Sequence, residues 1–140
     1  MTPPPSKGPF EPIASEAGPL VLVVDDNERN LRLARDVLRA AGFRTLEATT
    51  GAEALALAER ELPDVVLLDL GLPDLHGTAV ARGLKEAERT AGIPVVALTS
   101  QPLEGGDWHV AAGFSGYLEK PFDVGTFPDL VRGYCATGAG

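Results

Sequence analysis

Acidic residues follow two of the apolar stretches in the sequence. Asp25 and Asp26 come directly after residues 20–24, and Asp69 follows residues 65–68. Three carboxylates brought together repel one another, so such a cluster favours a bound cation. Hard oxygen ligands select Mg²⁺, which keeps coordination positions for water and phosphate oxygens. The sequence has no cluster of His or Cys, which argues against zinc. The three acids therefore predict a magnesium site that can receive a phosphoryl group.

Two further polar residues follow apolar stretches, Thr99 after residues 93–98 and Lys120 after residues 116–118. The Lys120 ammonium group is a point charge suited to a phosphoryl group, and the Thr99 hydroxyl can hydrogen-bond a phosphoryl oxygen. Asp69 would be the nucleophile, and it needs no general base because a carboxylate is already ionised at neutral pH. Together these residues predict a site that makes and holds a phosphorylated carboxylate.

Each of these residues also has a simpler interpretation. Asp69 could merely begin a turn, and Asp25 and Asp26 could be acids that cap a helix. Lys120 could be a solvated surface residue. The functional interpretation is favoured because all of these residues follow predicted strands whose carboxyl ends would lie along one edge of a sheet.

The elements that position these residues alternate between strands and helices. Continuous apolar stretches indicate strands buried on both faces, and alternation with helices indicates a doubly wound parallel sheet. Asn27 is the expected N-cap of the first helix and Gly42 its C-terminal glycine, and the capping box from Thr50 to Glu53 opens the second. The predicted strands are residues 20–24, 43–48, 64–69, 93–98 and 116–118. The predicted helices are residues 28–41, 51–62, a segment around 80–87, a short helix within 102–113, and 123–135, the last with Phe127, Leu130, Val131 and Tyr134 on one side.

Composition limits the class of protein. The chain has 140 residues, about one domain, and a net charge of −8 that argues against nucleic acid as a direct partner. No apolar stretch is long enough for a membrane helix, and no secretory signal is visible. The single cysteine, Cys135, cannot form an internal disulfide. Together these features favour the cytoplasm. We expect a flexible proline-rich tail over 1–18, one domain over 19–135 and a short C-terminal tail over 136–140.

Taken together, the motifs resemble the receiver domain of bacterial two-component response regulators, of the single-domain, chemotaxis-regulator-like type. The resemblance covers about residues 19–135 and implies a flavodoxin-like (βα)₅ fold with strand order 2-1-3-4-5. It also implies phosphotransfer from a histidine kinase or a phosphotransfer protein. The motifs are Val23-Val24-Asp25-Asp26-Asn27, Leu68-Asp69, Leu72-Pro73-Asp74 with Gly77, Ala97-Leu98-Thr99-Ser100 and Tyr117-Leu118-Glu119-Lys120-Pro121.

The resemblance implies a role for each matching acid. Asp69 would be the phosphoacceptor and would also bind the metal. Asp26 would bind Mg²⁺ directly and Asp25 mainly through water, with the backbone carbonyl of Gly71 as a further ligand.

The resemblance also implies roles at the ends of the last two strands. Thr99 and Lys120 would bind the phosphoryl group, and Tyr117 would swing inward when Thr99 moves. Pro121 is the candidate for a cis peptide bond. Tyr117 could instead be an ordinary core residue.

The expected function is signalling through protein contacts rather than enzyme catalysis. The acting surface would comprise the fourth and fifth helices and the fifth strand, which would bind a downstream protein; dimerisation on phosphorylation stays open.

A phosphatase of the haloacid dehalogenase type is a competing interpretation, but those enzymes need a second Asp where Gly71 stands. A small FMN-binding protein is disfavoured because no hydroxyl-rich phosphate loop follows the first strand. The chain could also be a receiver taken from a hybrid kinase or larger regulator.

Three other side chains have no predicted chemical role. His76 is expected to face solvent in a loop. Trp108 is expected to pack the fourth helix, and Cys135 is expected to be packed near a helix end rather than to act as a redox switch.

Overall fold

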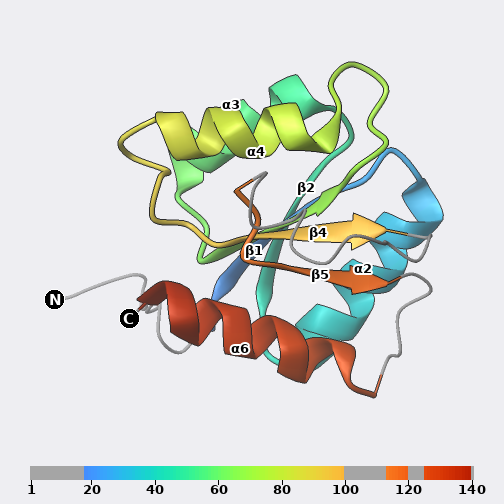
Figure 1. Cartoon of the computed structure of the whole chain (residues 1–140). Coiled ribbons are helices and arrows are strands. Elements are labelled where there is room, and N and C mark those ends of the chain that lie inside the picture. Colours follow the sequence, from blue (N-terminus) through green and yellow to red (C-terminus); the bar gives the residue numbers. More distant parts are fainter. Residues whose placement is uncertain (1–17, 100–112, 120–124, 140) are drawn as a thin grey trace, which may run out of the picture.

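A central sheet of five parallel strands organises the molecule (Figure 1). The computed structural model describes residues 18–99, 113–119 and 125–139. The strand order is β2-β1-β3-β4-β5, which confirms the predicted fold. In chain order the elements are β1 (Leu20–Val24), α2 (Glu28–Ala40), β2 (Arg44–Ala48), α3 (Gly51–Glu61), β3 (Val65–Asp69), α4 (Gly77–Glu86), β4 (Val95–Thr99), β5 (Gly116–Glu119) and α6 (Phe127–Ala139).

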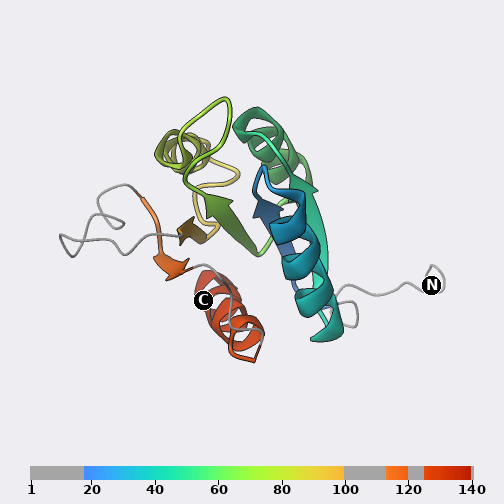
Figure 2. The ribbon, with the colours of Figure 1, turned by 90° about the vertical axis from the view of Figure 1, so that its right-hand side faces the viewer.

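The helices cover both faces of the sheet, with α3 and α4 on one side and α2 and α6 on the other (Figures 1 and 2). Successive side chains of a strand point to opposite faces, so each central strand contributes to two separate hydrophobic clusters. In β1, Leu22 and Val24 pack with residues of α3 and α4, whereas Val21 and Val23 pack with residues of α2 and α6. All four are at most 1% exposed. This burial on both faces explains why the central strands are apolar without interruption.

The first two helices begin as the sequence predicts. The Asn27 side chain accepts hydrogen bonds from backbone N–H groups in the first turn of α2, and Gly42 after that helix has a φ of 96°. At α3 the Thr50 hydroxyl accepts from the N–H of Glu53 at 3.1 Å. The Glu53 carboxylate, however, accepts from the N–H of Thr49 at 2.9 Å, so the capping box closes one residue earlier than its usual form.

The last helix begins later than predicted. A start at residue 123 would place Pro128 at the sixth helical position, where its missing N–H and its ring would disrupt the helix. In the structure α6 runs from Phe127 to Ala139, and its first turn includes Pro128. The backbone N–H groups of a first turn have no intrahelical acceptor, so proline costs little there.

The buried side of α6 also differs in part from the prediction. Phe127 and Val131 are buried and Tyr134 is half-buried, as expected. Leu130 is predicted on the same side but is 48% exposed, so it lies at the border of the buried side rather than within it. Cys135, which is 7% exposed, packs instead in the same hydrophobic cluster as Phe127 and Val131. Burial raises the pKa of the Cys135 thiol to about 11, which agrees with a packed, unreactive residue.

Several predictions fall outside the described residues. These are the N-terminal tail, nearly all of the short helix within 102–113, Trp108, Lys120 and Pro121. Among the residues that are described, none of the helices is long and apolar enough to cross a bilayer.

Candidate metal and phosphoryl site

The structure brings the three predicted acids together at the carboxyl edge of the sheet. Asp25 and Asp26 follow β1, and Asp69 is the last residue of the neighbouring strand β3. The two strands pair in parallel with Val24 opposite Leu68, so both strands reach the edge at the same level. One carboxylate oxygen from each acid lies within 4.8 Å of those of the other two. This spacing allows a single cation to contact all three acids.

The three carboxylates differ in their exposure to solvent. Asp25 is 1% exposed, Asp69 is half-buried and Asp26 is exposed. The buried carboxylate of Asp25 is held on both oxygens: Oδ1 accepts from the N–H of Asn27 at 2.9 Å, and Oδ2 accepts from the side-chain amide of Asn30 at 3.1 Å. Sequence reasoning missed Asn30, because an Asn in the first turn of a helix usually indicates local capping alone.

The loop that follows Asp69 folds back on itself. Its ends meet in an antiparallel bridge between Gly71 and His76 and in a hydrogen bond from the N–H of Gly77 to the carbonyl of Leu70 at 2.9 Å. A Cβ atom on Gly77 would lie 2.8 Å from Leu70 Cα and 2.9 Å from the carbonyl oxygen of Asp69, so only glycine fits. A Cβ atom on Gly71, in contrast, would meet nothing within 4 Å. The space into which a side chain at position 71 would project is therefore open.

Asp74 anchors this loop to α3. Its two carboxylate oxygens accept hydrogen bonds from the N–H of Gly51 at 2.7 Å and the N–H of Ala52 at 3.1 Å. These two hydrogen bonds, that of Gly51 first, hold the pKa of Asp74 below its usual value because they favour the charged form. The sequence does not reveal this structural role of Asp74, because its hydrogen-bond partners lie more than twenty positions away along the chain.

His76 is exposed, as expected, but it has a structural role that the sequence did not reveal. It is the N-cap of α4, and its Nδ1 accepts a hydrogen bond from the N–H of Thr78 at 3.2 Å. The same nitrogen lies 2.9 Å from the Thr78 hydroxyl oxygen. Histidine is not among the residues that usually cap helices, so its position directly before a helical pattern was the only available signal.

The predicted phosphoryl-binding and switch residues are described only in part. Thr99 is the last residue of β4 and is 7% exposed. It directly follows Leu98, which pairs with Asp69, so Thr99 reaches the same edge as the acids. Tyr117 lies on β5 and is 41% exposed, which shows that it is not an ordinary core residue here. Lys120 and Pro121 lie outside the described residues.

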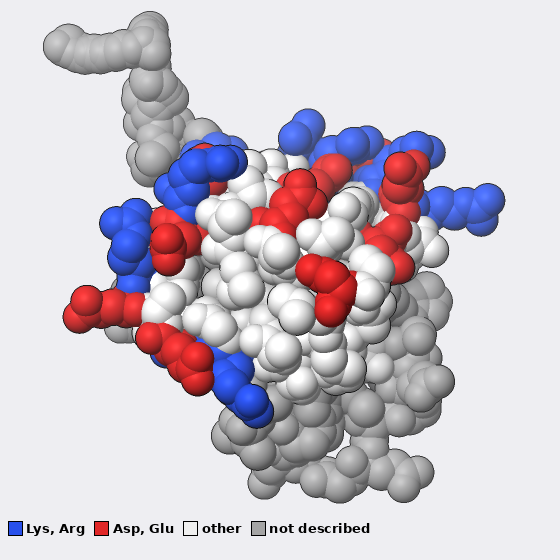
Figure 3. Space-filling model, turned by 90° about the horizontal axis from the view of Figure 1, so that it is seen from above, with Lys and Arg blue, Asp and Glu red and all other residues white. Residues whose placement is uncertain are grey.

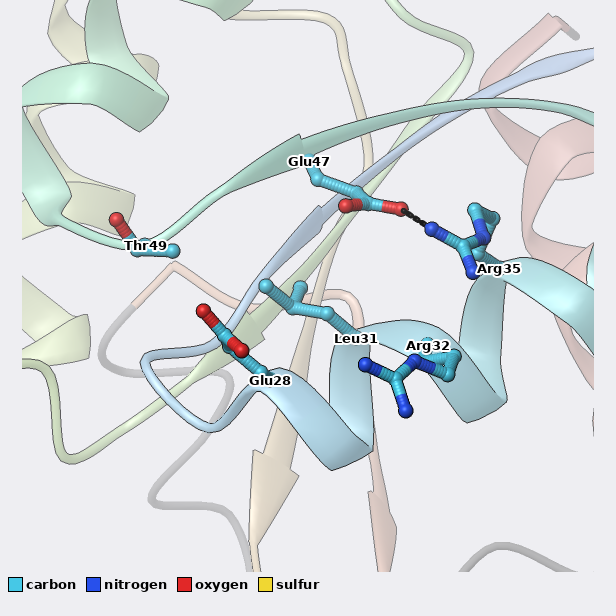
Figure 4. A pocket seen from close by; sticks show the side chains of 6 residues that line it. All are labelled: Glu28, Leu31, Arg32, Arg35, Glu47 and Thr49. Atoms are coloured by element: carbon cyan, nitrogen blue, oxygen red, sulfur yellow. Dashed lines mark ion pairs between the residues drawn. The ribbon is translucent and has the colours of Figure 1, made fainter.

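A shallow polar hollow of about 200 Å³ lies between α2 and the end of β2 (Figure 4). It contains side chains of both charges, and Arg35 and Glu47 pair across it at 3.5 Å. None of the three clustered acids lines it, so it is separate from the candidate metal site. The residues that line it are Glu28, Leu31, Arg32, Arg35, Glu47 and Thr49.

Comparison with known families agrees with this architecture. The sequence profile of the response regulator receiver domain matches residues 21–132, so the chain belongs to the response regulator receiver domain family. It is 36% identical to the polar-differentiation response regulator DivK of Brucella ovis, over 81% of this chain and 94% of that protein. The equivalent protein of Brucella abortus matches equally well.

Solved structures share the fold over most of their length. The receiver domain of the sensor histidine kinase PA1611 from Pseudomonas aeruginosa, which has a magnesium ion coordinated in its active-site cleft, is 32% identical with a TM-score of 0.78. The match covers 86% of this chain and 99% of that one. Chemotaxis protein CheY4 of Vibrio cholerae is 26% identical with a TM-score of 0.78, over 83% and 98% of the two chains.

The family assignment decides between the competing functions. The protein is a receiver domain of two-component signalling, a class of signalling modules. The haloacid dehalogenase alternative has no support from these matches, and the position where such a phosphatase needs its second Asp holds Gly71.

Proposed function

We propose that Asp69 accepts a phosphoryl group from a phosphohistidine, carried by a histidine kinase or a phosphotransfer protein, in a magnesium-dependent reaction. The observation that supports this assignment is the cluster of Asp25, Asp26 and Asp69, whose carboxylates each place one oxygen within 4.8 Å of the others. The three acids also differ in their exposure to solvent. Asp25 is buried and fixed, whereas Asp69 is accessible to a donor. Of the three acids, Asp69 alone belongs to the central strand β3, between β1 and β4.

The residues present suit Mg²⁺. All the side-chain donors are carboxylate oxygens, which hard divalent cations prefer, and a similar receiver domain was solved with magnesium in its cleft. Asp26 and Asp69 would bind the metal directly, Asp25 mainly through water, and the backbone carbonyl of Gly71 would be a further ligand. When bound, Mg²⁺ offsets negative charge on the phosphoryl oxygens.

In the transfer step, a carboxylate oxygen of Asp69 attacks the phosphorus atom in line with the bond to the donor histidine. A P–O bond forms while the P–N bond breaks, and the histidine nitrogen keeps the electron pair. Lys120 and Thr99 bind the phosphoryl oxygens and orient the group. The location of Thr99 beside the Asp69 strand supports this role.

Phosphorylation would then change the protein surface. Thr99 moves toward the phosphoryl group, and the space it leaves admits Tyr117, now 41% exposed. The two conformations need to differ by only a few kcal/mol for this response. The peptide bond before Pro121 stays a candidate for the cis form.

The output is protein binding at the face that contains β5 and the neighbouring helices, whether by a downstream target or by a second phosphorylated copy. Tyr117 and Leu130 provide exposed apolar area there, at 41% and 48% exposure. On the surface formed by α3 and α4, Lys and Arg are interspersed with Asp and Glu (Figure 3). This surface does not have the basic stripe that is typical of nucleic-acid binding. With a net charge of −8, these features support protein partners in the cytoplasm rather than DNA or a membrane surface.

Phosphorylation by a small phosphoramidate tests this proposal, because that donor has the same P–N bond as phosphohistidine. With Mg²⁺ present, the wild type should form one phosphoryl adduct that hydroxylamine removes, as expected of an acyl phosphate. Asp69→Asn should form none, whereas Asp36→Asn, at an exposed acid on α2, should be labelled like the wild type. An equal yield of adduct on Asp69→Asn would overturn the assignment of the phosphoacceptor.

A further inference from the structure

The side chain of Asn30, in the first turn of α2, reaches back to the acid cluster. Its amide Nδ2 donates to Asp25 Oδ2 at 3.1 Å, while its backbone N–H donates to the Asn27 cap at 3.2 Å. The other oxygen of Asp25 accepts from the N–H of Asn27. The carboxylate of Asp25 is therefore fixed in direction from two sides.

The chemistry of this contact suits a cation site. A carboxylate oxygen has two lone pairs, so it can accept a hydrogen bond and still face a cation. An amide donor is neutral, so it orients Asp25 without cancelling the negative charge that attracts a cation. A Lys or Arg at position 30 would compete with the metal for that charge.

The contact also explains an unfavourable choice of residue. Asn is a weaker helix former than Ala, and position 30 is only half-buried. If position 30 served only the helix, alanine would be at least as good there. The hydrogen bond from the Asn30 side chain to the buried Asp25 carboxylate is a function that alanine could not provide.

We propose that Asn30 is a positioning residue for the magnesium site: it holds Asp25 in the orientation that receives the hydrated metal. This inference rests on the proposed function, since it assumes that the cluster binds Mg²⁺. Hydrogen-bonding partners of metal-binding groups commonly change metal affinity by about 10- to 100-fold when removed. Because Asp25 would act through water, the lower end of that range applies.

Calorimetric titration of the metal-free protein with Mg²⁺ tests the inference. Asn30→Ala should bind Mg²⁺ about tenfold more weakly than the wild type. Arg29→Ala, at the exposed neighbouring position of the same turn, should bind like the wild type. The melting temperature of Asn30→Ala without metal should be close to that of the wild type, since alanine improves the helix while the contact is lost.

The outcomes separate the two proposals. If the wild type binds Mg²⁺, Asp26→Asn loses that binding, and Asn30→Ala binds like the wild type, then Asn30 has no positioning role and the proposed function stands. If the wild type itself gives no saturable Mg²⁺ binding, the magnesium-dependent function fails and this inference fails with it.

A second variant reports on the contact without relying on metal affinity. Asn30→Asp keeps the size of the side chain but places a carboxylate against that of Asp25. An acid in the first turn should otherwise favour the helix, so a lower melting temperature without metal points to repulsion at Asp25. Mg²⁺ should then raise the melting temperature of Asn30→Asp more than that of the wild type. An unchanged melting temperature without metal would contradict the contact.

Discussion

Two connections bring acids to the same edge of the sheet, and they do so by different means. The turn between β1 and α2 is short, and the buried carboxylate of Asp25 accepts hydrogen bonds from Asn27 and Asn30, which lie at most five positions away. The loop between β3 and α4 is longer, and its acid, Asp69, is half-buried. That loop is anchored through Asp74 to α3, more than twenty residues away in sequence.

The difference matches the two tasks that the proposed reaction requires. A metal-binding acid benefits from burial and a fixed direction, because its charge then acts at full strength on a cation. A phosphoacceptor has to be reached by a group carried on another protein, so partial exposure is useful. The Asn27 cap should therefore affect mainly the local stability of α2, whereas the geometry around Asp69 should depend on tertiary contacts of its loop.

The largest expected effect comes from breaking the loop after Asp69. Gly77→Ala places a Cβ atom 2.8 Å from Leu70 Cα and 2.9 Å from the Asp69 carbonyl oxygen, and backbone atoms cannot rotate away as a side chain can. We expect a loss of about 1–3 kcal/mol in the free energy of unfolding, measured with urea, and a slower phosphorylation of Asp69. Gly92→Ala is the control, since its Cβ atom would meet nothing within 4 Å. Equal stability of the two variants would show that the loop adapts freely.

The same contrast explains which parts of the site the sequence predicts. Asp25, Asp26, Asp69 and Thr99 end apolar strands, so the strand pattern and the parallel topology predict their common edge. The local cap of α2 at Asn27 also follows from the pattern of nearby residues.

Other features depend on distance in space, and sequence patterns do not encode them. The anchoring of Asp74 on the first turn of α3 requires the relative placement of two helices, and the reach of Asn30 to Asp25 requires a particular side-chain direction. The start of α6 at Phe127 could have been predicted, because the position of Pro128 already limits where the helix can begin.

An intermediate effect is expected at the local turn. Asn27→Ala removes the side-chain acceptor that caps α2, and such caps are worth about 1 kcal/mol. The cost should appear in the free energy of unfolding, while the rate of Asp69 phosphorylation changes less than in Gly77→Ala. Asn27→Ser retains a capping oxygen and should restore most of the stability. If Asn27→Ala slowed phosphorylation more than Gly77→Ala, the supposed independence of the local turn would be wrong.

The smallest effect concerns the anchor of the longer loop, and its signature is a dependence on pH. The hydrogen bonds from Gly51 and Ala52 lower the pKa of Asp74 in the folded protein below its usual value, because these backbone N–H groups bind the charged form better than the neutral form. Asp74 therefore stabilises the fold fully at pH values above the pKa that it has in the unfolded chain. This contribution to the free energy of unfolding disappears as the pH falls through the lower pKa that Asp74 has in the folded protein. Urea unfolding should find Asp74→Ala less stable than the wild type at neutral pH, with a smaller difference at about pH 3. Glu88→Ala, at an exposed acid after α4, should show no such convergence. A difference for Asp74→Ala that stays constant across this range would mean that the loop is anchored by packing rather than by the charge of Asp74.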